Sequence, residues 1–481
     1  MGAKRESDMR VATSVGGVLL AAVLVAGCSG GNGDSRDQAK NGFAQPSHKA
    51  EPLAELNVPS AYDPAKGWDA TLNWVPGAVR TIPVTAAPRS GVIAMLHVAS
   101  NGYTVEAKAA DTGEARWLSA PWNPPTPVEG AEGDAGSGEL GEIPDVTAVE
   151  RDGREYVIAY AHGMRGRDSL HEGAEVVRLA VYAADASGTS VKPLREIDVP
   201  VSADPGEVRV GSTGGRVLVA WGGNEAFPRS AAAVDVATGK VDSYQKPDGL
   251  LSQCATTVAC SSTRVMAATP DGPLVSMGTG GFGIPGHWFS DDVRPHGLEA
   301  KTGIVGSWNG DAYGVADGNL LVGWSTGGKF GAPNDPLWSV HDVRTGKLRA
   351  SMTCAHDVAD SDEARDYPVI ISPDGRYLAA GPVVFDLQRG KGTCLEGDGD
   401  RKTIALAAIR DDGTAYGAVL GKSAASGSEA VVAELDLAST GEPKVLGTGV
   451  RVPYLTSVNG SGLFLDRDND ANVRVSLRRE R

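Results

Sequence analysis

The stretch Pro368–Leu395, PVIISPDGRYLAAGPVVFDLQRGKGTCL, decides which fold the sequence predicts. Short apolar runs alternate in it with turn residues such as Ser372-Pro373-Asp374-Gly375 and Arg389-Gly390-Lys391. Proline presets φ in such turns, and glycine accepts a positive φ. Four short strands joined by tight turns make one blade of a β-propeller. We therefore expect one complete four-stranded blade in this stretch.

The end of the third strand and the turn after it recur along the chain. The recurrences are AADTGEARW (109–117), VDVATGKVDSY (234–244), LEAKTGIVGSW (298–308), HDVRTGKLRA (341–350), FDLQRGKGTC (385–394) and LDLASTGEPKV (435–445). An acidic side chain that accepts hydrogen bonds from turn amides, followed by a glycine, suits a tight hairpin. Regular repetition is typical of propellers. We expect blades over about 80–120, 145–200, 206–250, 263–309, 312–355, 366–397 and 402–448.

The last residues, 451–481, hold three strand-like stretches and lack a fourth. The segment ATLNWV (Ala70–Val75) precedes the first blade and has no blade of its own. We predict that it completes the last blade, because closing the ring removes two exposed sheet edges. The predicted fold class is therefore all-β, an eight-bladed β-propeller of four-stranded antiparallel blades. A seven-bladed ring with an external C-terminal hairpin is the alternative.

The composition agrees with a turn-dense all-β chain. Its 481 residues include 63 glycines and 28 prolines, and 41% are hydrophobic, which is enough for a large core. The formal net charge of −15 argues against nucleic-acid binding, which needs a basic face. It also disfavours adsorption to anionic lipid through charge alone.

The N-terminus has the pattern of a secretory signal. Lys4, Arg5 and Arg10 precede the apolar run Val11–Ala26, which is short for a membrane span. The run ends in Val25-Ala26-Gly27-Cys28, which resembles the lipobox of bacterial lipoproteins. The resemblance implies a signal peptide over residues 1–27 and a diacylglyceryl-modified Cys28. An uncleaved membrane helix or an accidental cysteine is the alternative.

Domain boundaries and location follow from that resemblance. Residues 28–60 carry the lipid and a polar, flexible tether, and residues 61–481 form the propeller. Two acyl chains suffice for stable anchoring, so we expect the protein on the outer face of the cell membrane.

Two further resemblances concern the propeller. YDPAKGW, at Tyr62–Trp68, is similar to a string in secreted lipoproteins of actinobacteria. The pattern A-x-D-x-x-T-G-K, matched by Ala233–Lys240, resembles repeats of quinoprotein-like (PQQ-type) and WD40-like propellers. Quinoprotein dehydrogenases carry a vicinal Cys-Cys pair, which this chain lacks. We therefore expect no quinone and no other cofactor.

Four cysteines remain beside Cys28, in a compartment where disulfides persist. Cys254 and Cys260 are close in sequence and are predicted to pair, which leaves Cys354 to pair with Cys394. The alternative is four buried thiols.

Motifs that suggest catalysis lack their structural context. The G-x-G-x-x-G match at 278–283 and the G-x-S-x-G match at 323–327 are each followed by Gly/Pro-rich sequence, where a helix is required. The run at 466–470 resembles a calcium loop without its later ligands, and no histidines have metal-ligand spacing. We expect no catalytic residue and no metal site.

Three loops after second strands share a pattern of glycines, then Phe, then Pro: 221–228, 278–289 and 324–333. Loop aromatics with arginine nearby are typical of recognition surfaces. The candidate binding residues are Trp221, Phe227, Phe282, His287, Trp288, Phe289, Trp324 and Phe330, with Arg165 and Arg167 of a fourth loop. The alternative is that the phenylalanines fill gaps between blades. We predict that Trp288→Ala weakens binding and leaves folding intact.

The sequence favours a monomeric binding module without catalysis, whose ligand is a protein, peptide or glycan. The alternatives are a passive scaffold of a cell-envelope complex, or a degenerate quinoprotein-like or hydrolase-like enzyme.

Overall fold

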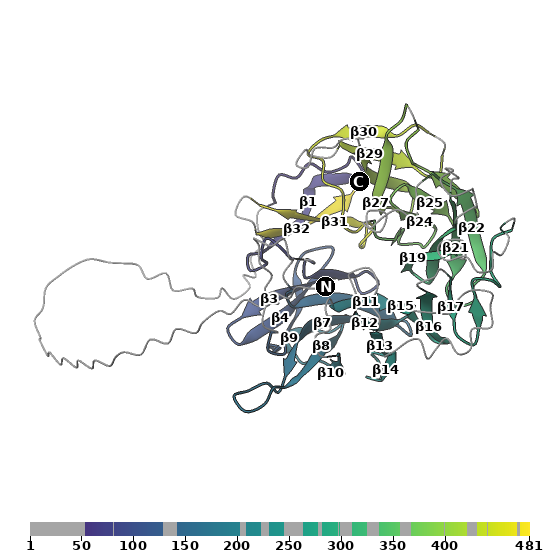
Figure 1. The fold of residues 1–481 in the computed structure, drawn as a ribbon. Helices are drawn as coiled ribbons and strands as arrows, with labels where there is room; N and C mark the ends of the chain where they lie inside the picture. Colours follow the sequence, from purple (N-terminus) through teal and green to yellow (C-terminus); the bar gives the residue numbers. More distant parts are fainter. Residues whose placement is uncertain are drawn as a thin grey trace, which may run out of the picture. The chain divides into compact units, whose positions relative to one another are not determined.

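The computed structural model describes residues 53–79, 81–127, 142–202, 208–222, 230–244, 263–277, 281–296, 298, 310–324, 336–355, 367–398, 400–420, 431–439, 441–468 and 472–481. Every regular element in these residues is a β-strand, and they contain no helix able to cross a membrane. The strands form eight sheets arranged in a ring, which confirms the eight-bladed β-propeller (Figure 1).

The blades take the following strands from the chain. Blade 1 holds β2 (Val84–Ala87), β3 (Val92–Ala99), β4 (Gly102–Ala109) and β5 (Ala115–Ser119). Blade 2 holds β6 (Asp145–Arg151), β7 (Arg154–Arg165), β8 (Ala174–Ala183) and β10 (Arg195–Pro200). Blade 3 holds β11 (Val208–Thr213), β12 (Arg216–Trp221), β13 (Ser230–Val234) and β14 (Val241–Tyr244). Blade 4 holds β15 (Thr263–Thr269), β16 (Gly272–Met277), β17 (Phe282–Ile284) and β18 (Trp288–Phe289).

The second half of the chain repeats the arrangement. Blade 5 holds β19 (Asp311–Ala316), β20 (Asn319–Trp324), β21 (Leu337–Asp342) and β22 (Leu348–Thr353). Blade 6 holds β23 (Ile370–Ile371), β24 (Tyr377–Ala380), β25 (Val383–Asp386) and β26 (Lys391–Cys394). Blade 7 holds β27 (Thr403–Ile409), β28 (Thr414–Leu420), β29 (Val431–Asp436) and β30 (Lys444–Gly447). Blade 8 holds β31 (Ser461–Arg467), β32 (Val473–Glu480) and β1 (Tyr62–Leu72).

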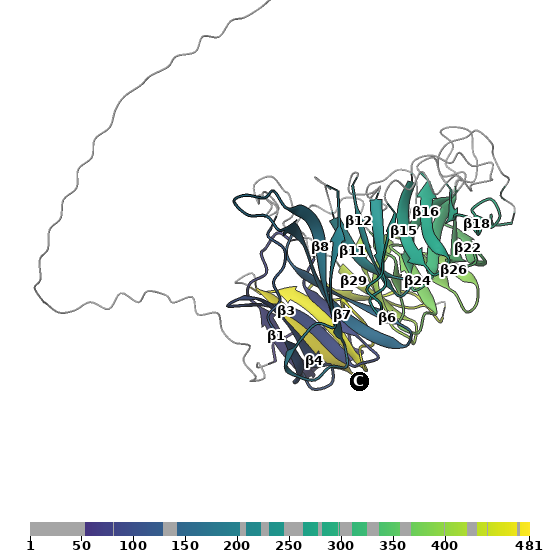
Figure 2. The ribbon, with the colours of Figure 1, turned by 90° about the horizontal axis from the view of Figure 1, so that it is seen from below.

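The hydrophobic core is divided among the interfaces between blades. Eight clusters of buried side chains each join two neighbouring sheets. A blade is therefore covered on both faces, and β20 is buried along its whole length. This explains why the strands read as continuous short apolar runs. Figure 2 shows strands of successive blades side by side around the ring.

The N-terminal strand closes the ring, as predicted, but β1 (Tyr62–Leu72) includes only Ala70–Leu72 of the predicted segment Ala70–Val75. β1 pairs antiparallel with β32 over Gly67–Leu72, and Figure 1 shows the purple β1 beside the yellow C-terminal strands. Asp69 of β1 and Arg478 of β32 form a fully buried ion pair, with 2.7 Å between Oδ1 and Nη1. Arg478 also donates to the carbonyl oxygens of Ala54 and Trp68. An isolated bridge from Leu455 to Leu463 of β31 adds the innermost pairing of this blade.

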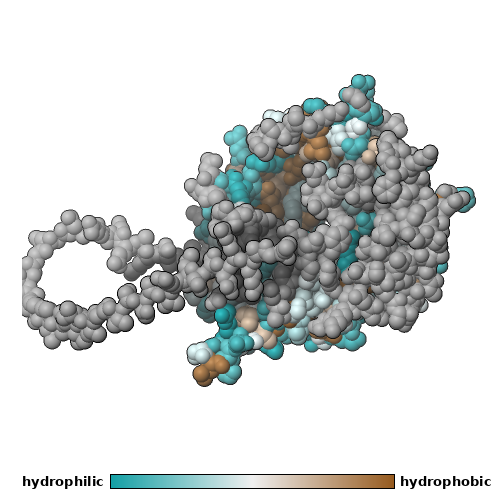
Figure 3. Space-filling model, viewed as in Figure 1, coloured by the Kyte–Doolittle hydropathy of each residue, from teal (hydrophilic) through white to brown (hydrophobic). Residues whose placement is uncertain are grey.

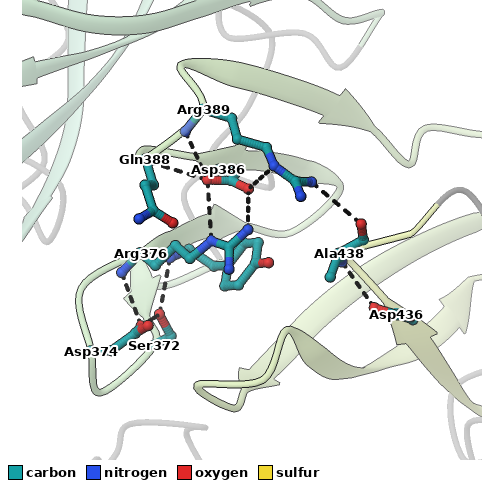
Figure 4. Close-up of polar contacts among 9 residues, drawn as sticks. Ser372, Asp374, Arg376, Asp386, Gln388, Arg389, Asp436 and Ala438 are labelled. Atoms are coloured by element: carbon teal, nitrogen blue, oxygen red, sulfur yellow. Dashed lines mark hydrogen bonds and ion pairs between the residues drawn. The ribbon is translucent and has the colours of Figure 1, made fainter.

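The recurring turns work as the sequence predicts. Asp235 accepts hydrogen bonds from the amides of Ala237 and Thr238, and Asp386 accepts from those of Gln388 and Arg389. The turn glycines have positive φ, such as 79° at Gly239. Figure 4 shows Asp386 also held by Arg376, while Arg389 reaches the carbonyl oxygen of Ala438 in the next blade. The repeated turn thus shapes each hairpin and also ties adjacent blades.

Two further devices join neighbouring blades. The strand β9 (Gly188–Val191) leaves blade 2 and pairs in parallel with β5, giving blade 1 a fifth strand. A disulfide links Cys354, directly after β22, to Cys394 at the end of β26, which confirms this predicted pair. The predicted Cys254–Cys260 pair and Cys28 lie outside the described residues.

Blade 4 differs from its prediction. Phe282 begins the third strand and Trp288-Phe289 is the fourth, so the expected recognition loop over 278–289 contains two strands. The turn predicted at 298–308 lies outside the described residues except for Leu298.

Candidate functional site

Five of the seven predicted aromatic binding residues lie in the core. Trp221, Phe282, Trp324, Trp288 and Phe289 are each at most 7% exposed. Phe282 packs edge-on against Trp288 and Trp324, and the Trp288 indole donates to the Arg344 carbonyl oxygen at 3.0 Å. These five side chains fill interfaces between blades and offer no exposed contact surface. Because Trp288 is buried, we now expect Trp288→Ala to open a cavity and destabilise the fold, in contrast to the expectation from sequence.

The strand period explains this correction. Trp221 shares a strand face with Val217 and Val219, and all three join the cluster between blades 2 and 3. Phe227 and Phe330 lie outside the described residues. Exposed positions are found at His287, Arg165 and Arg167. Arg165 ends β7 and Arg167 lies in the turn that follows it. Arg165 pairs with Asp198 of β10 at 3.4 Å.

A different group of side chains converges at the ring axis. In each blade the first strand is innermost, and it begins on the face that carries the turns between second and third strands; we call this the upper face. Thr81, Asp145 and Tyr454 stand at or just before the innermost pairing of blades 1, 2 and 8, respectively. Together with Tyr160 of β7 they form the axial cluster. Figure 3 shows the face seen in Figure 1 hollowed beside β31 and β27, with hydrophobic residues in the hollow.

Asp145 is the centre of the axial cluster. Its carboxylate accepts hydrogen bonds from the Tyr160 hydroxyl at 2.9 Å, from the Thr81 hydroxyl and from the Val146 amide. Asp145 is only 4% exposed. Burial raises the pKa of Asp145, although these three donors act in the opposite direction. A carboxyl group with a pKa raised by burial is a recognised mark of functional sites.

Two tyrosine side chains, Tyr160 and Tyr454, interact with this carboxyl group. Burial, and then the charge of Asp145, raises the pKa of Tyr160 and also that of Tyr454. More than half of Tyr454 is nevertheless exposed, at 54%. The axial cluster therefore presents to solvent an aromatic ring beside a buried carboxyl group.

Beside the axial cluster lies a second arrangement, the histidine bridge of Glu142, His162 and Glu175. His162 Nδ1 lies 3.2 Å from Glu142 Oε2, and His162 Nε2 lies 3.1 Å from Glu175 Oε2. The side chains of His162 and Glu175 are about nine-tenths buried, at 10% and 11% exposed. Burial alone would lower the pKa of His162, but the two carboxylates outweigh it and the pKa is raised.

The contacts of the histidine bridge limit what His162 can do chemically. His162 is bonded at both ring nitrogens, so it has no lone pair available as a base. The described residues contain no group of three or more His, Cys, Asp or Glu side chains that could hold a metal ion. A serine–histidine contact does exist between Ser339 Oγ and His341 Nε2, at 2.8 Å, but both residues are fully buried in blade 5.

No sequence motif predicted the axial cluster or the partners of His162. Its members come from three blades and share no motif. A weak signal is present in the polar residues that open innermost strands, since Asp145 is followed by the apolar Val146 of β6.

Comparisons with known proteins give similarity in fold. No protein-family description and no curated protein matches the chain. Similar solved structures include an uncharacterized protein from Listeria monocytogenes EGD-e, with 10% identity over 81% of this chain and 89% of that chain and a TM-score of 0.35. TolB from Acinetobacter baumannii has 14% identity, coverage of 81% and 79%, and a TM-score of 0.26. The Dos1 propeller has 9% identity, coverage of 86% and 95%, and a TM-score of 0.34.

Proposed function

We propose that this protein is a membrane-anchored, extracytoplasmic binding module that holds its ligand at the axial cluster, without turnover. The observation that carries the proposal is the convergence of Asp145, Thr81 and Tyr454 from three consecutive blades. Sites built at the junction of several elements, with a few polar groups on an apolar frame, are typical of ligand binding.

The chemistry of the cluster indicates the kind of ligand. Carboxylate and phenol oxygens accept hydrogen bonds, and the Tyr454 ring offers flat apolar contact. The net charge of −15 favours a ligand that is neutral or basic. Sugar hydroxyl groups and the basic side chains of a peptide both meet these requirements.

Anchoring rests on the sequence before the described residues. The Val25–Cys28 lipobox supports cleavage before Cys28 and a diacylglyceryl group on its sulfur. Mass spectrometry of membrane-extracted protein should find a lipid-modified N-terminus at Cys28. An unprocessed N-terminus at Met1, or membrane association unchanged by Cys28→Ala, would contradict the anchor.

A glycan and basic-peptide array, followed by affinity measurement on each hit, tests the binding site. We expect Tyr454→Ala to weaken binding by about thirtyfold, the effect of removing an anchoring aromatic. Its melting temperature should stay at the wild-type value, since Tyr454 is half exposed. The matched control is Val445→Ala on β30, 66% exposed and in the outermost strand of blade 7. Equal affinities for wild type and Tyr454→Ala would contradict the site.

A second candidate, a scaffold in a cell-envelope complex, is favoured by one feature of blade 2. The turn between β7 and β8 presents Leu170, 86% exposed, between Arg167 and His171. An exposed leucine beside arginine suits a protein contact. Loss of complex assembly with Leu170→Ser, together with unchanged array binding, would favour the scaffold.

A further inference from the structure

The histidine bridge spans three separate segments of blade 2. Glu142 lies in the segment that leads into β6, His162 lies on β7, and Glu175 lies near the start of β8. Glu142 is three residues before Asp145, the centre of the axial cluster. The bridge therefore fastens the backbone that positions Asp145 to the two central strands of the blade.

We propose that the histidine bridge is a proton-operated latch that fixes the approach to Asp145 when His162 is protonated and loosens it when the proton leaves. This regulates the site of the proposed function, so its physiological meaning rests on that function. The latch itself can be observed without any ligand.

The geometry requires a proton on each ring nitrogen. A carboxylate can only accept, so each His162 nitrogen must donate to the oxygen it faces. Only the imidazolium form has two N–H donors. When it releases one proton to water, one nitrogen is left with its lone pair toward a carboxylate oxygen at 3.1–3.2 Å. That contact becomes repulsive, and one side of the bridge must part.

Of the two contacts of His162, the one with Glu142 breaks more easily. Its side chain is 28% exposed, against 11% for Glu175, so its carboxylate recovers hydration with less rearrangement. Among the described residues, blade 3 packs the apolar Val208, Val210 and Trp221 against this side of blade 2. Among the described residues of blade 2, further charged groups include Asp145, which accepts from its own donors, and Arg165 and Arg178, which both pair with Asp198.

The direction of the pH effect follows from the raised pKa of His162. A group with a raised pKa in the folded state contributes its full stabilisation below its ordinary pKa, about 6.5 for histidine. That contribution is lost as pH rises through the folded-state value. The latch is therefore closed in mildly acidic solution and opens toward alkaline pH.

Hydrogen exchange of the whole protein between pH 5.5 and 8.5, corrected for intrinsic exchange rates, tests the latch. We expect protection of residues 142–147 to fall with rising pH, by about tenfold for each unit by which folding raises the His162 pKa. His162→Gln should abolish this dependence. The matched control His171→Gln, at an exposed histidine that contacts Asp168, should keep it.

The latch would be contradicted if protection of residues 142–147 in the wild type did not change with pH. The same holds if His162→Gln kept the pH dependence of the wild type. Should His162→Gln fold poorly, the NMR titration of the wild-type His162 ring decides. A midpoint at or below the ordinary histidine value contradicts the proposal, and a higher midpoint supports it. Failure of the ligand arrays would leave this result untouched.

Discussion

The ion pair of Asp69 and Arg478 lies where the two ends of the chain close the ring. Both are completely buried, at 1% and 0% exposed, and they join strands from opposite ends of the chain. Buried charges are costly unless paired, so removing one partner leaves the other uncompensated. Without the Asp69 carboxylate, the charge of Arg478 faces only neutral acceptors such as the Trp68 carbonyl oxygen.

Asp69→Asn should therefore lower the free energy of unfolding by about 3–5 kcal/mol, measured by urea denaturation. Asp63→Asn is the control on the same strand, because Asp63 contacts the exposed Lys66, and its midpoint should be unchanged. Replacing both partners, as in Asp69→Leu with Arg478→Met, should restore much of the loss. A wild-type midpoint for Asp69→Asn would show that the pair does not hold the closure.

His341 provides a pH prediction of the opposite sign to that for His162. Burial lowers the pKa of His341 to about 4, although the hydrogen bond to the Gly346 carbonyl oxygen opposes this. The folded state therefore keeps His341 neutral while the unfolded chain protonates near pH 6.5. Its stabilising contribution is full above that pH and declines as pH falls toward 4.

Lowering the pH from 7.5 to 5 should reduce the free energy of unfolding of the wild type by about 2 kcal/mol, because His341 is protonated in the unfolded chain but not in the folded one. His341→Asn, which keeps a donor for Gly346, should show a shallower pH dependence by that amount. Parallel stability–pH curves for the two proteins would contradict a neutral buried His341.

Among the elements, the blades could be predicted from sequence because each carries its own local signal. The Asp–Gly turns sit within hairpins, and the structure keeps them as Asp235 and Asp386 turns. The sequence did not predict that the aromatic side chains are buried, because residues at strand ends were interpreted as loop residues. Trp221 and Trp324 are examples. Here strand alternation, which places Trp221 in line with Val219, was the better guide.

The disulfide between Cys354 and Cys394 links the outer strands of blades 5 and 6 across a sequence separation of 40. Replacing Cys354 and Cys394 by alanine should lower the unfolding free energy by about 2–4 kcal/mol, the usual range for a loop of this length. Denaturant midpoints of the wild type and the double variant measure this. Alkylation of either cysteine in the native, unreduced protein would show that the bond does not form.

At the scale of the whole molecule, ring closure was predictable because residues 451–481 lack a strand and the N-terminus has one to spare. The axial cluster was not, because it depends on how three blades meet at the axis. Thr81 and Asp145 are 64 residues apart, and Tyr454 comes from the other end of the chain. No local sequence pattern indicates which residues of the three blades come together at the axis.

Deleting Tyr62–Leu72 should expose the edge of β32 and remove the partner of Arg478. We expect the ring to lose its single cooperative melting transition, because it can no longer close. The open edge also favours association with other molecules. Deleting residues 29–45 of the tether is the control and should leave melting unchanged. Melting of the β1 deletion at the wild-type temperature would contradict closure by the two termini.

Ligand binding at the axial cluster can be tested by photocrosslinking in cells. A benzophenone amino acid is placed at position 454, and in a second strain at position 445 on β30. We predict a discrete crosslinked product at position 454 that Asp145→Asn abolishes, and none at position 445. No product at position 454, or the same products at both positions, would contradict ligand binding at the axial cluster.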